Sequence, residues 1–174
     1  ITATTATGNG TITDLGVPDP TEHGICWSTS ENPTIADDAT AHGSVSSTGA
    51  FTSAMTGLTS NVTYYVRAYA TNTAGTAYGE QVSFTTQPTL PTVTTQAVTE
   101  ITATTAMGNG NITDLGIPDP TQHGLCWSTS AGPTVTDDKT VNGSVSATGA
   151  FTGELTGLTS YETYYVRAYV TNTA

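Results

Sequence analysis

The aspartates are the residues of this sequence whose type and spacing are best suited to binding chemistry. Each half of the chain holds a DLGxPDP segment and, farther along, an adjacent Asp pair. Carboxylate oxygens gathered in loops are ligands that Ca²⁺ prefers. We predict that a calcium site between the two halves would use Asp37, Asp38, Asp114 and Asp119. The alternative is that these side chains cap turns, as loop aspartates commonly do, since no known calcium-loop spacing is present.

A second candidate site is an aromatic face in the segment TYYVRAY, which occurs in both halves. Alternate side chains of a strand point to opposite faces, so Tyr64 and Val66 should face the core. We predict that the other set is exposed and that its arginine stacks between the two tyrosine rings. This face and its copy comprise Tyr65, Arg67, Tyr69, Tyr165, Arg167 and Tyr169. Such rings can stack on sugars, which makes glycans candidate ligands, or can contact a neighbouring subunit. The alternative is ordinary cross-strand packing.

The cysteines Cys26 and Cys126 occupy equivalent positions in the two halves, so a disulfide within one half is excluded. We predict buried thiols that act as small apolar residues, with a crosslink between chains as the alternative. His23 and Cys26 would lie on opposite faces of one strand and could not share a metal. Because no nucleophile motif, phosphate loop or zinc-type spacing is present, we expect neither an enzyme nor a cofactor other than the calcium considered above.

These residues belong to a sequence that repeats itself at a spacing of 100 residues. Residues 1–74 align without a gap on residues 101–174, with 55 of 74 positions identical. A repeat of this size is a whole domain. The 41 threonines, together with Val, Tyr and Ile, favour strands. We therefore predict an all-β chain of two β-sandwich domains, residues 1–86 and 92–174, joined by a short, stiff, Pro-containing linker at residues 87–91.

Alternation and turn residues predict the strands inside each domain. In the second half we expect strands at residues 92–99, 104–113, 123–129, 150–156 and 162–171, with a weak edge strand at 141–145. The first half follows the same order, lacks a counterpart of the initial strand, and adds a final strand at residues 78–86 that the second half lacks. We expect these ends to reflect a longer array. The predicted core of the first half comprises Ile25, Trp27, Phe51, Met55, Leu58, Tyr64, Val66, Ala68 and Ala70.

The run from Leu58 through TYYVRAYATN to Phe84-Thr85-Thr86 resembles the fibronectin type III pattern, most closely the tandem modules of bacterial secreted and surface proteins. The resemblance implies two tandem Ig-like, fibronectin type III-like sandwiches. It also implies that the hydroxyl of Tyr64, six residues after Leu58, ties the neighbouring corner to the backbone. Leu158 and Tyr164 repeat this spacing. The HGICWSTSENPT run is also similar to these bacterial modules.

The net charge of the chain restricts the kinds of partner that it can bind. The formal net charge is −11, with only three Lys and Arg residues, so nucleic acid and anionic membranes are poor partners. No apolar stretch is long enough to span a membrane. Together with the resemblance, this predicts an extracellular or cell-surface bacterial structural module. It would act as a spacer or stalk, or as a building block of an adhesin or filament, with like repeats as its neighbours. The alternative function is a carbohydrate-binding accessory module.

Overall fold

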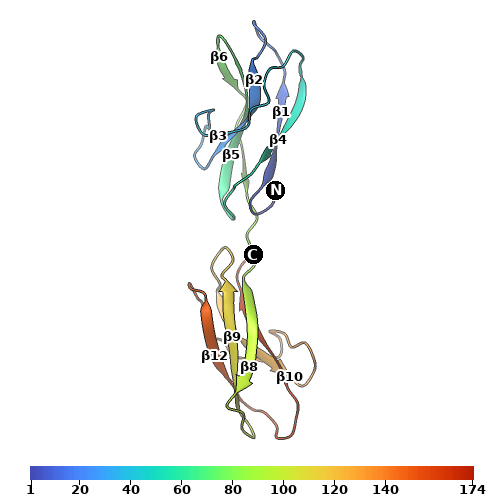
Figure 1. The fold of residues 1–174 in the computed structure, drawn as a ribbon, viewed down its shortest axis with the longest axis vertical. Coiled ribbons are helices and arrows are strands. Elements are labelled where there is room, and N and C mark those ends of the chain that lie inside the picture. Colours follow the sequence, from blue (N-terminus) through green and yellow to red (C-terminus); the bar gives the residue numbers. More distant parts are fainter. The chain divides into compact units, whose positions relative to one another are not determined.

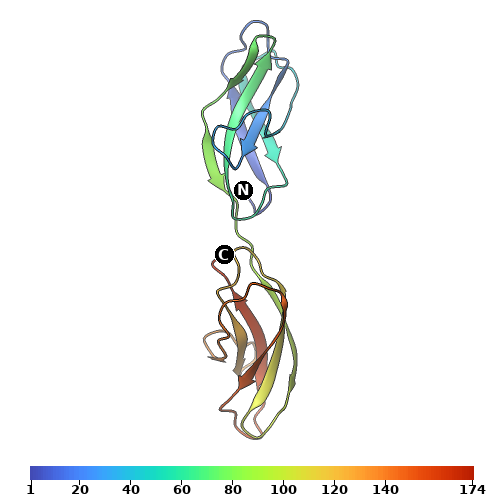
Figure 2. The same cartoon turned by 90° about the vertical axis from the view of Figure 1, so that its left-hand side faces the viewer.

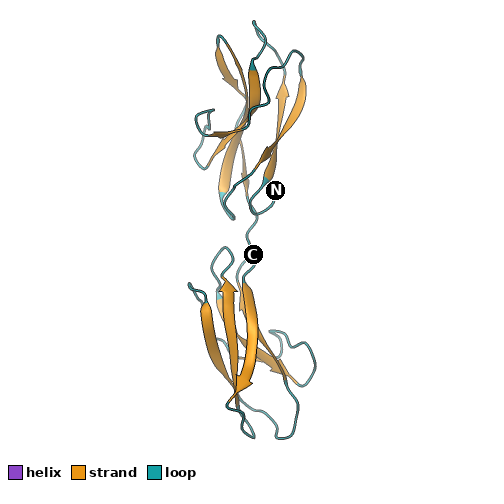
Figure 3. Ribbon diagram, in the orientation of Figure 1, coloured by secondary structure: helices purple, strands orange, loops and turns teal.

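The computed structural model describes all 174 residues, and every regular element in it is a β-strand (Figures 1 and 3). The chain divides into two compact units, Ile1–Gln87 and Pro88–Ala174. This division falls inside the segment that the sequence predicts to be a linker. Thr89 pairs with Ile117 through two backbone hydrogen bonds of 3.0 Å, so part of the predicted linker packs on the second unit.

The first unit is built from two antiparallel sheets (Figures 1 and 2). Its strands are β1 (Ala6–Ile12), β2 (Glu22–Ser28), β3 (Asp38–Ala39), β4 (Gly49–Met55), β5 (Thr63–Asn72), β6 (Gly75–Tyr78) and β7 (Val82–Thr85). One sheet pairs β1 with β4. The other has the order β3-β2-β5-β6, and β7 also pairs with β5. The sheets contribute facing layers to one core, which is a sandwich-like arrangement.

The second unit follows the same plan with two differences at its edges. Its strands are β8 (Thr92–Thr99), β9 (Ala106–Asp114), β10 (Gln122–Ser128), β11 (Asp138–Lys139), β12 (Gly149–Leu155) and β13 (Tyr165–Thr171). The sheets have the orders β12-β9-β8 and β11-β10-β13. Strand β8 therefore adds a third member to the sheet that corresponds to β1 and β4. Strand β13, the counterpart of β5, pairs only with β10.

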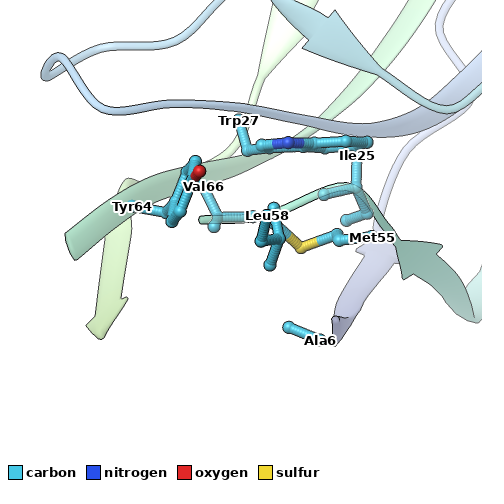
Figure 4. Close-up of a cluster of buried hydrophobic side chains, with 7 residues drawn as sticks. All are labelled: Ala6, Ile25, Trp27, Met55, Leu58, Tyr64 and Val66. Atoms are coloured by element: carbon cyan, nitrogen blue, oxygen red, sulfur yellow. The ribbon is translucent and has the colours of Figure 1, made fainter. Parts of the chain in front are cut away.

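Each unit has its own hydrophobic core between its sheets. In the first unit the core side chains are Ala6, Ile25, Trp27, Met55, Leu58, Tyr64 and Val66 (Figure 4). In the second unit they are Ala106, Leu125, Trp127 and Leu155. Alternate side chains of a strand point to the same face, so Ile25 and Trp27 of β2 and Tyr64 and Val66 of β5 all face this core. The predicted core residues of the first unit are thus confirmed, except that Ala70 is not in the cluster and that Phe51 and Ala68 lie at its border.

The predicted strands agree with the structure in kind and order, with two exceptions. The edge strand expected at residues 141–145 is wrong, because the strand is β11, at Asp138–Lys139. Residues 140–143 do run beside β10 and bond to it, but Gly143 has a φ of 82°, which interrupts extended geometry. The strand predicted at residues 78–86 is interrupted, since β6 ends at Tyr78 and β7 begins at Val82. Three residues, 79–81, stand opposite two residues of β5, 67 and 68, so the pairing shifts register there.

The tyrosine corner that the resemblance implies is present in both units. The Thr59 N–H donates to the Tyr64 hydroxyl at 3.0 Å, and the Thr159 N–H donates to the Tyr164 hydroxyl at the same distance. Leu58 and Tyr64 are both buried. The hydroxyl therefore satisfies a backbone donor at a corner where the chain passes between the two sheets.

Replacing Tyr64 by phenylalanine is expected to lower the free energy of unfolding of the first unit by about 1 kcal/mol, because the Thr59 N–H loses its acceptor. The partly exposed Tyr65 gives the matched control, since Tyr65→Phe should leave stability nearly unchanged. Urea unfolding followed by circular dichroism measures both variants. Equal losses in the two would show that the corner hydrogen bond contributes nothing specific.

Candidate functional site

The outer face of β2 and β5 is not the open aromatic surface that alternation predicts. Tyr69 is only 3% exposed, and its copy Tyr169 is 8% exposed, so the prediction that these two rings lie on the surface is wrong. The Tyr69 hydroxyl lies 2.8 Å from the Thr40 carbonyl oxygen and 2.9 Å from the Glu22 carboxylate, two acceptors that share its single proton. The Tyr169 hydroxyl reaches the Thr140 carbonyl oxygen at 2.6 Å. A neighbouring segment therefore covers both rings.

That covering segment follows β2 closely. The Thr40 N–H donates to the Ile25 carbonyl oxygen at 2.9 Å, and the His42 N–H donates to the His23 carbonyl oxygen at 2.8 Å. Gly24, directly opposite Tyr69 in the β2–β5 pairing, makes this approach possible. A Cβ there would lie 1.8 Å from the Thr40 carbonyl oxygen and 3.0 Å from the Tyr69 ring. A glycine in this strand is thus the sequence signal that the outer face is covered.

The enclosed site changes the acidity of these hydroxyls. Burial, with added contributions from the hydrogen bond and charge of Glu22, raises the pKa of Tyr69 to about 12. Burial likewise raises the pKa of Tyr169. Both effects have the same cause, because a phenolate removed from water loses hydration. The hydroxyls therefore stay protonated and act as donors over the whole physiological range.

The Tyr69 hydroxyl is expected to make the first unit lose stability between about pH 10 and pH 12. An unfolded tyrosine has a pKa of about 10, whereas that of folded Tyr69 is about 12. As the pH rises above 10, the unfolded chain releases this proton first, so unfolding becomes more favourable. Below pH 10 the hydroxyl is protonated in both states and the stabilisation is intact. The full difference corresponds to up to about 3 kcal/mol.

Urea unfolding at pH 9 and at pH 11.5 measures this loss. Tyr69→Phe should make the first unit less sensitive to the change in pH, whereas Tyr65→Phe should behave like the original chain. An equally steep loss in the Tyr69→Phe variant would assign the alkaline effect to other groups.

The arginine of this face stacks on a different ring from the one predicted. The Arg67 guanidinium carbon lies 4.6 Å from the centroid of Tyr78 in β6, and its Nε donates to the Gly79 carbonyl oxygen at 2.9 Å. It does not lie between Tyr65 and Tyr69, because the Tyr69 ring turns toward Thr40. In the second unit Arg167 is exposed, and its Nη1 donates to the Pro133 carbonyl oxygen at 3.4 Å.

One tyrosine of the predicted face remains accessible in each unit. Tyr65 is partly exposed, and Tyr165 is 46% exposed. They occupy equivalent positions opposite Ser28 and Ser128 in the strand pairing. Each unit therefore presents a single ring from this face, where alternation alone would predict a pair of rings.

The aspartates form contacts inside their own loops. The Asp37 carboxylate accepts from the Thr34 N–H at 2.8 Å and from its hydroxyl at 3.2 Å, and Asp137 repeats both contacts with Thr134. Asp114 accepts from the Gly116 N–H at 2.7 Å. Asp38 and Asp119 are exposed. No group of three or more His, Cys, Asp or Glu side chains is placed to hold a metal. Turn capping accounts for Asp37 and Asp114, and calcium binding stays an untested prediction.

Both cysteine thiols are buried and free. The Cys26 Sγ lies 3.5 Å from the Pro33 carbonyl oxygen and 3.6 Å from that of Arg67, and the Cys126 Sγ lies 3.5 Å from the Arg167 carbonyl oxygen. Burial raises the pKa of both thiols, which disfavours the reactive thiolate. The prediction of buried thiols is confirmed. A crosslink between chains through Cys26 or Cys126 would require a buried thiol to become exposed, and it stays an untested prediction.

Sequence reasoning missed a polar cluster between the sheets of the first unit. The Nε2 of His42 contacts the Ser53 hydroxyl, and the Thr40 hydroxyl donates to the same oxygen at 2.8 Å. The rings of His23 and His42 stack with centroids 5.4 Å apart. Ser53 is only 3% exposed, so this serine and histidine do not present a nucleophile to solvent.

The second unit replaces both members of this pair, since Asn142 and Gly153 stand where His42 and Ser53 stand in the first. The paired replacement is the signal in the sequence that could have located the contact. Because the two copies differ here, the cluster is a packing feature of one unit and not a site that both share.

No protein-family model matches this chain, and no curated protein matches it in sequence. The structure contains no helical segment that could serve as a membrane span.

Proposed function

We propose that this chain is a pair of structural repeat modules from an extracellular bacterial protein, serving as a spacer or stalk or as a building block of an adhesin or filament. One observation carries the proposal. The two copies keep the residues that build the framework, such as Trp27 and Tyr64 with their counterparts, while the polar cluster at His42 and Ser53 is replaced in the second copy. Two copies that share their framework but not this polar cluster fit a mechanical role better than a chemical one.

The strand order supports the fibronectin type III-like part of the proposal. In the second unit a sheet of β8, β9 and β12 faces a sheet of β11, β10 and β13. With β8 taken as strand A, these are the A-B-E and C′-C-F groupings of an Ig-like sandwich. The corner bonds of Tyr64 and Tyr164 add a second feature of that family. The fold alone does not specify a function, so the repeat carries the functional argument.

Like repeats are the proposed partners. The chain has only three basic residues, which leaves little to attract phosphate or anionic lipid. Its buried thiols do not need a reducing compartment to stay unpaired. An extracellular position next to other copies of the same module fits these properties.

A carbohydrate-binding module is the second candidate, and the accessible rings of Tyr65 and Tyr165 favour it. An array of glycans tested against the chain and against the Tyr65→Ala, Tyr165→Ala double variant separates the two functions. The structural proposal expects no glycan affinity in either. Measurable affinity that disappears in the double variant would replace it with the carbohydrate-binding alternative.

The assembly state tests the proposal itself. Light scattering over a wide concentration range, with electron microscopy of the same samples, distinguishes a monomeric spacer from a self-assembling filament. Each measurement is made with Ca²⁺ and with a chelator. Disordered aggregation at low concentration would contradict both structural roles.

Thermal unfolding with Ca²⁺ and with a chelator tests the calcium site. A melting curve that Ca²⁺ leaves unchanged would reject the site predicted at Asp37, Asp38, Asp114 and Asp119.

A further inference from the structure

Both units have a strand whose outer edge pairs with no other strand. In the first unit β4 pairs only with β1, and in the second unit β12 pairs only with β9. Figure 1 shows β4 and β12 at the margins of their sheets. In the second unit the third strand of this sheet, β8, lies on the opposite side of β9. The open edge is therefore present whether or not the sheet has a third strand.

A contact in the second unit identifies the backbone groups that face this edge. The Nδ2 of Asn142 donates to the Thr152 carbonyl oxygen at 3.1 Å. Asn142 belongs to the segment beside β10 and not to the sheet of β9 and β12, so this carbonyl faces away from β9. Alternate residues of a strand point their backbone groups to the same side, so those of Ala150 and Glu154 face the edge as well. The corresponding residues of β4 all have exposed side chains and are Ala50, Thr52 and Ala54.

The carbonyl at the centre of this edge is capped in the second unit and free in the first. The amide of Asn142 occupies the Thr152 carbonyl oxygen, so a strand added to β12 would lose an acceptor there. The first unit has His42 in place of Asn142. The Nε2 of His42 contacts the Ser53 hydroxyl, and no side chain donates to the Thr52 carbonyl oxygen. The acceptor at the centre of β4 is therefore available to another strand.

The two edges also differ in charge. Strand β12 carries the exposed Glu154, whereas Ala54 stands at this position in β4. All seven residues of β4 are uncharged, and none is proline. Charged residues and prolines on edge strands are common protections against pairing with another chain. The second unit thus has two substitutions that protect its edge, and the first unit has neither.

We propose that β4 pairs with β4 of a second copy of this chain, in the antiparallel register that places the two Thr52 residues opposite each other. In this register Ala50 of each strand faces Ala54 of the other, and each facing pair exchanges two backbone hydrogen bonds. The two threonine side chains form a favourable cross-strand pair. A two-fold axis at Thr52 places each strand on the other, so β4 is complementary to itself. This is recognition by β-strand addition.

The pairing rests on the proposed role of like repeats as partners, and it names the surface through which they meet. The formal net charge of −11 on each chain opposes the contact, so association should strengthen as added salt screens the repulsion. One short strand pair forms a small, transient interface. Failure of this pairing would leave the spacer role standing, because a monomeric spacer needs no contact at β4.

Oxidative crosslinking of a Thr52→Cys variant of the full chain tests the pairing. The proposed register places the two Cα atoms of residue 52 about 5.5 Å apart, a separation that a disulfide can bridge. Thr152→Cys is the matched control, because residue 152 is exposed at the equivalent position of β12 and the native thiols are buried in both variants. Thr52→Cys should form covalent dimers about tenfold faster, because pairing raises the effective concentration of the two thiols. Equal rates for the two variants would overturn the proposal.

Exchanging the residues that differ between the two edges tests the cause of this difference. His42→Asn with Ala54→Glu gives β4 the protections of β12. In the Thr52→Cys chain this exchange should reduce the crosslinking rate to that of Thr152→Cys. Circular dichroism of the reduced chains checks that each variant keeps its fold. A rate that the exchange leaves unchanged would contradict pairing through the β4 edge.

The reverse exchange removes the protections of the second unit. Asn142→His with Glu154→Ala frees the Thr152 carbonyl oxygen and the charge-free edge beside it. In the Thr152→Cys chain this exchange should raise the crosslinking rate toward that of Thr52→Cys. A rate that stays low would show that other features of β12 keep it unpaired, and would contradict the protective role assigned to these two residues.

Amide NMR of the unaltered chain detects the same contact without added cysteines. As the protein concentration rises into the millimolar range, the amide resonances of Ala50, Thr52 and Ala54 should shift. Those of Thr152 and Glu154 should stay where they are and serve as the internal control. Added salt should enlarge the shifts of β4, because it screens the repulsion between the chains. Unchanged β4 resonances at high concentration and high salt would overturn the proposal.

Discussion

Replacing Trp27 by alanine is expected to lower the free energy of unfolding of the first unit by about 3–5 kcal/mol. Trp27 is 7% exposed and belongs to the core cluster with Ile25, Met55 and Leu58. Figure 4 shows its ring lying along this cluster. Truncation removes a large buried apolar area and leaves a cavity that strands fixed by their hydrogen bonds cannot fully close. A small domain has little stability to lose, so this unit should unfold at a much lower denaturant concentration.

The two tryptophans allow the unfolding of each unit to be followed separately. The chain has two tryptophans, Trp27 and Trp127, one in each core. In the Trp27→Ala variant, fluorescence therefore reports only on the second unit, while circular dichroism reports on both. The fluorescence transition should stay where it is, and part of the circular dichroism transition should move to lower denaturant. The reciprocal Trp127→Ala variant should reverse the pattern. A Trp127 transition that shifts together with the rest would contradict separate cores.

Replacing Gly24 by alanine is expected to cost the first unit about 3 kcal/mol, the upper end of the usual range for overpacking. The added Cβ would lie 1.8 Å from the Thr40 carbonyl oxygen and 2.9 Å from its carbonyl carbon. Backbone atoms cannot move aside as the end of a flexible side chain can. The segment at residues 40–43 would have to leave β2, which would also break the hydrogen bond from Tyr69 to Thr40.

Gly79→Ala is the matched control for this substitution. A Cβ at Gly79 would meet its nearest neighbour, the Ala68 carbonyl oxygen, at 3.6 Å, an ordinary contact. The free energy of unfolding of the Gly79→Ala variant should therefore change little. Urea unfolding measures both variants, and the near-ultraviolet spectrum should report release of the Tyr69 ring in Gly24→Ala alone. Similar stabilities for the two variants would show that the segment does not pack as tightly as described.

The sequence predicts the strands and the core well because both depend on alternation along the chain. The strand at Thr92–Thr99 has the predicted bounds, and Tyr64 and Val66 face the core as predicted. The corner bond of Tyr64 is confirmed as well. In each case a period of two, or a short fixed spacing, determines which side of the sheet a residue occupies.

Alternation does not reveal whether the other side of a sheet is open. Tyr69 lies on the outer face of β5 as its position predicts, yet it is buried because the segment containing Thr40 crosses over it. Arg67 stacks on Tyr78, which belongs to a different strand. Both contacts depend on the path of a loop and the register of a second strand. The spacing of residues along β5 does not predict the path of the loop or the register of the second strand.

We propose that the chain consists of two separately folded sandwich modules that can bear load in an array. Stretching single molecules between Ile1 and Ala174 tests it most directly. We expect two unfolding peaks, each releasing up to about 30 nm of chain, since each unit of 87 residues extends at most about 3.6 Å per residue. One peak that releases the whole chain, or extension without any force peak, would contradict the claim.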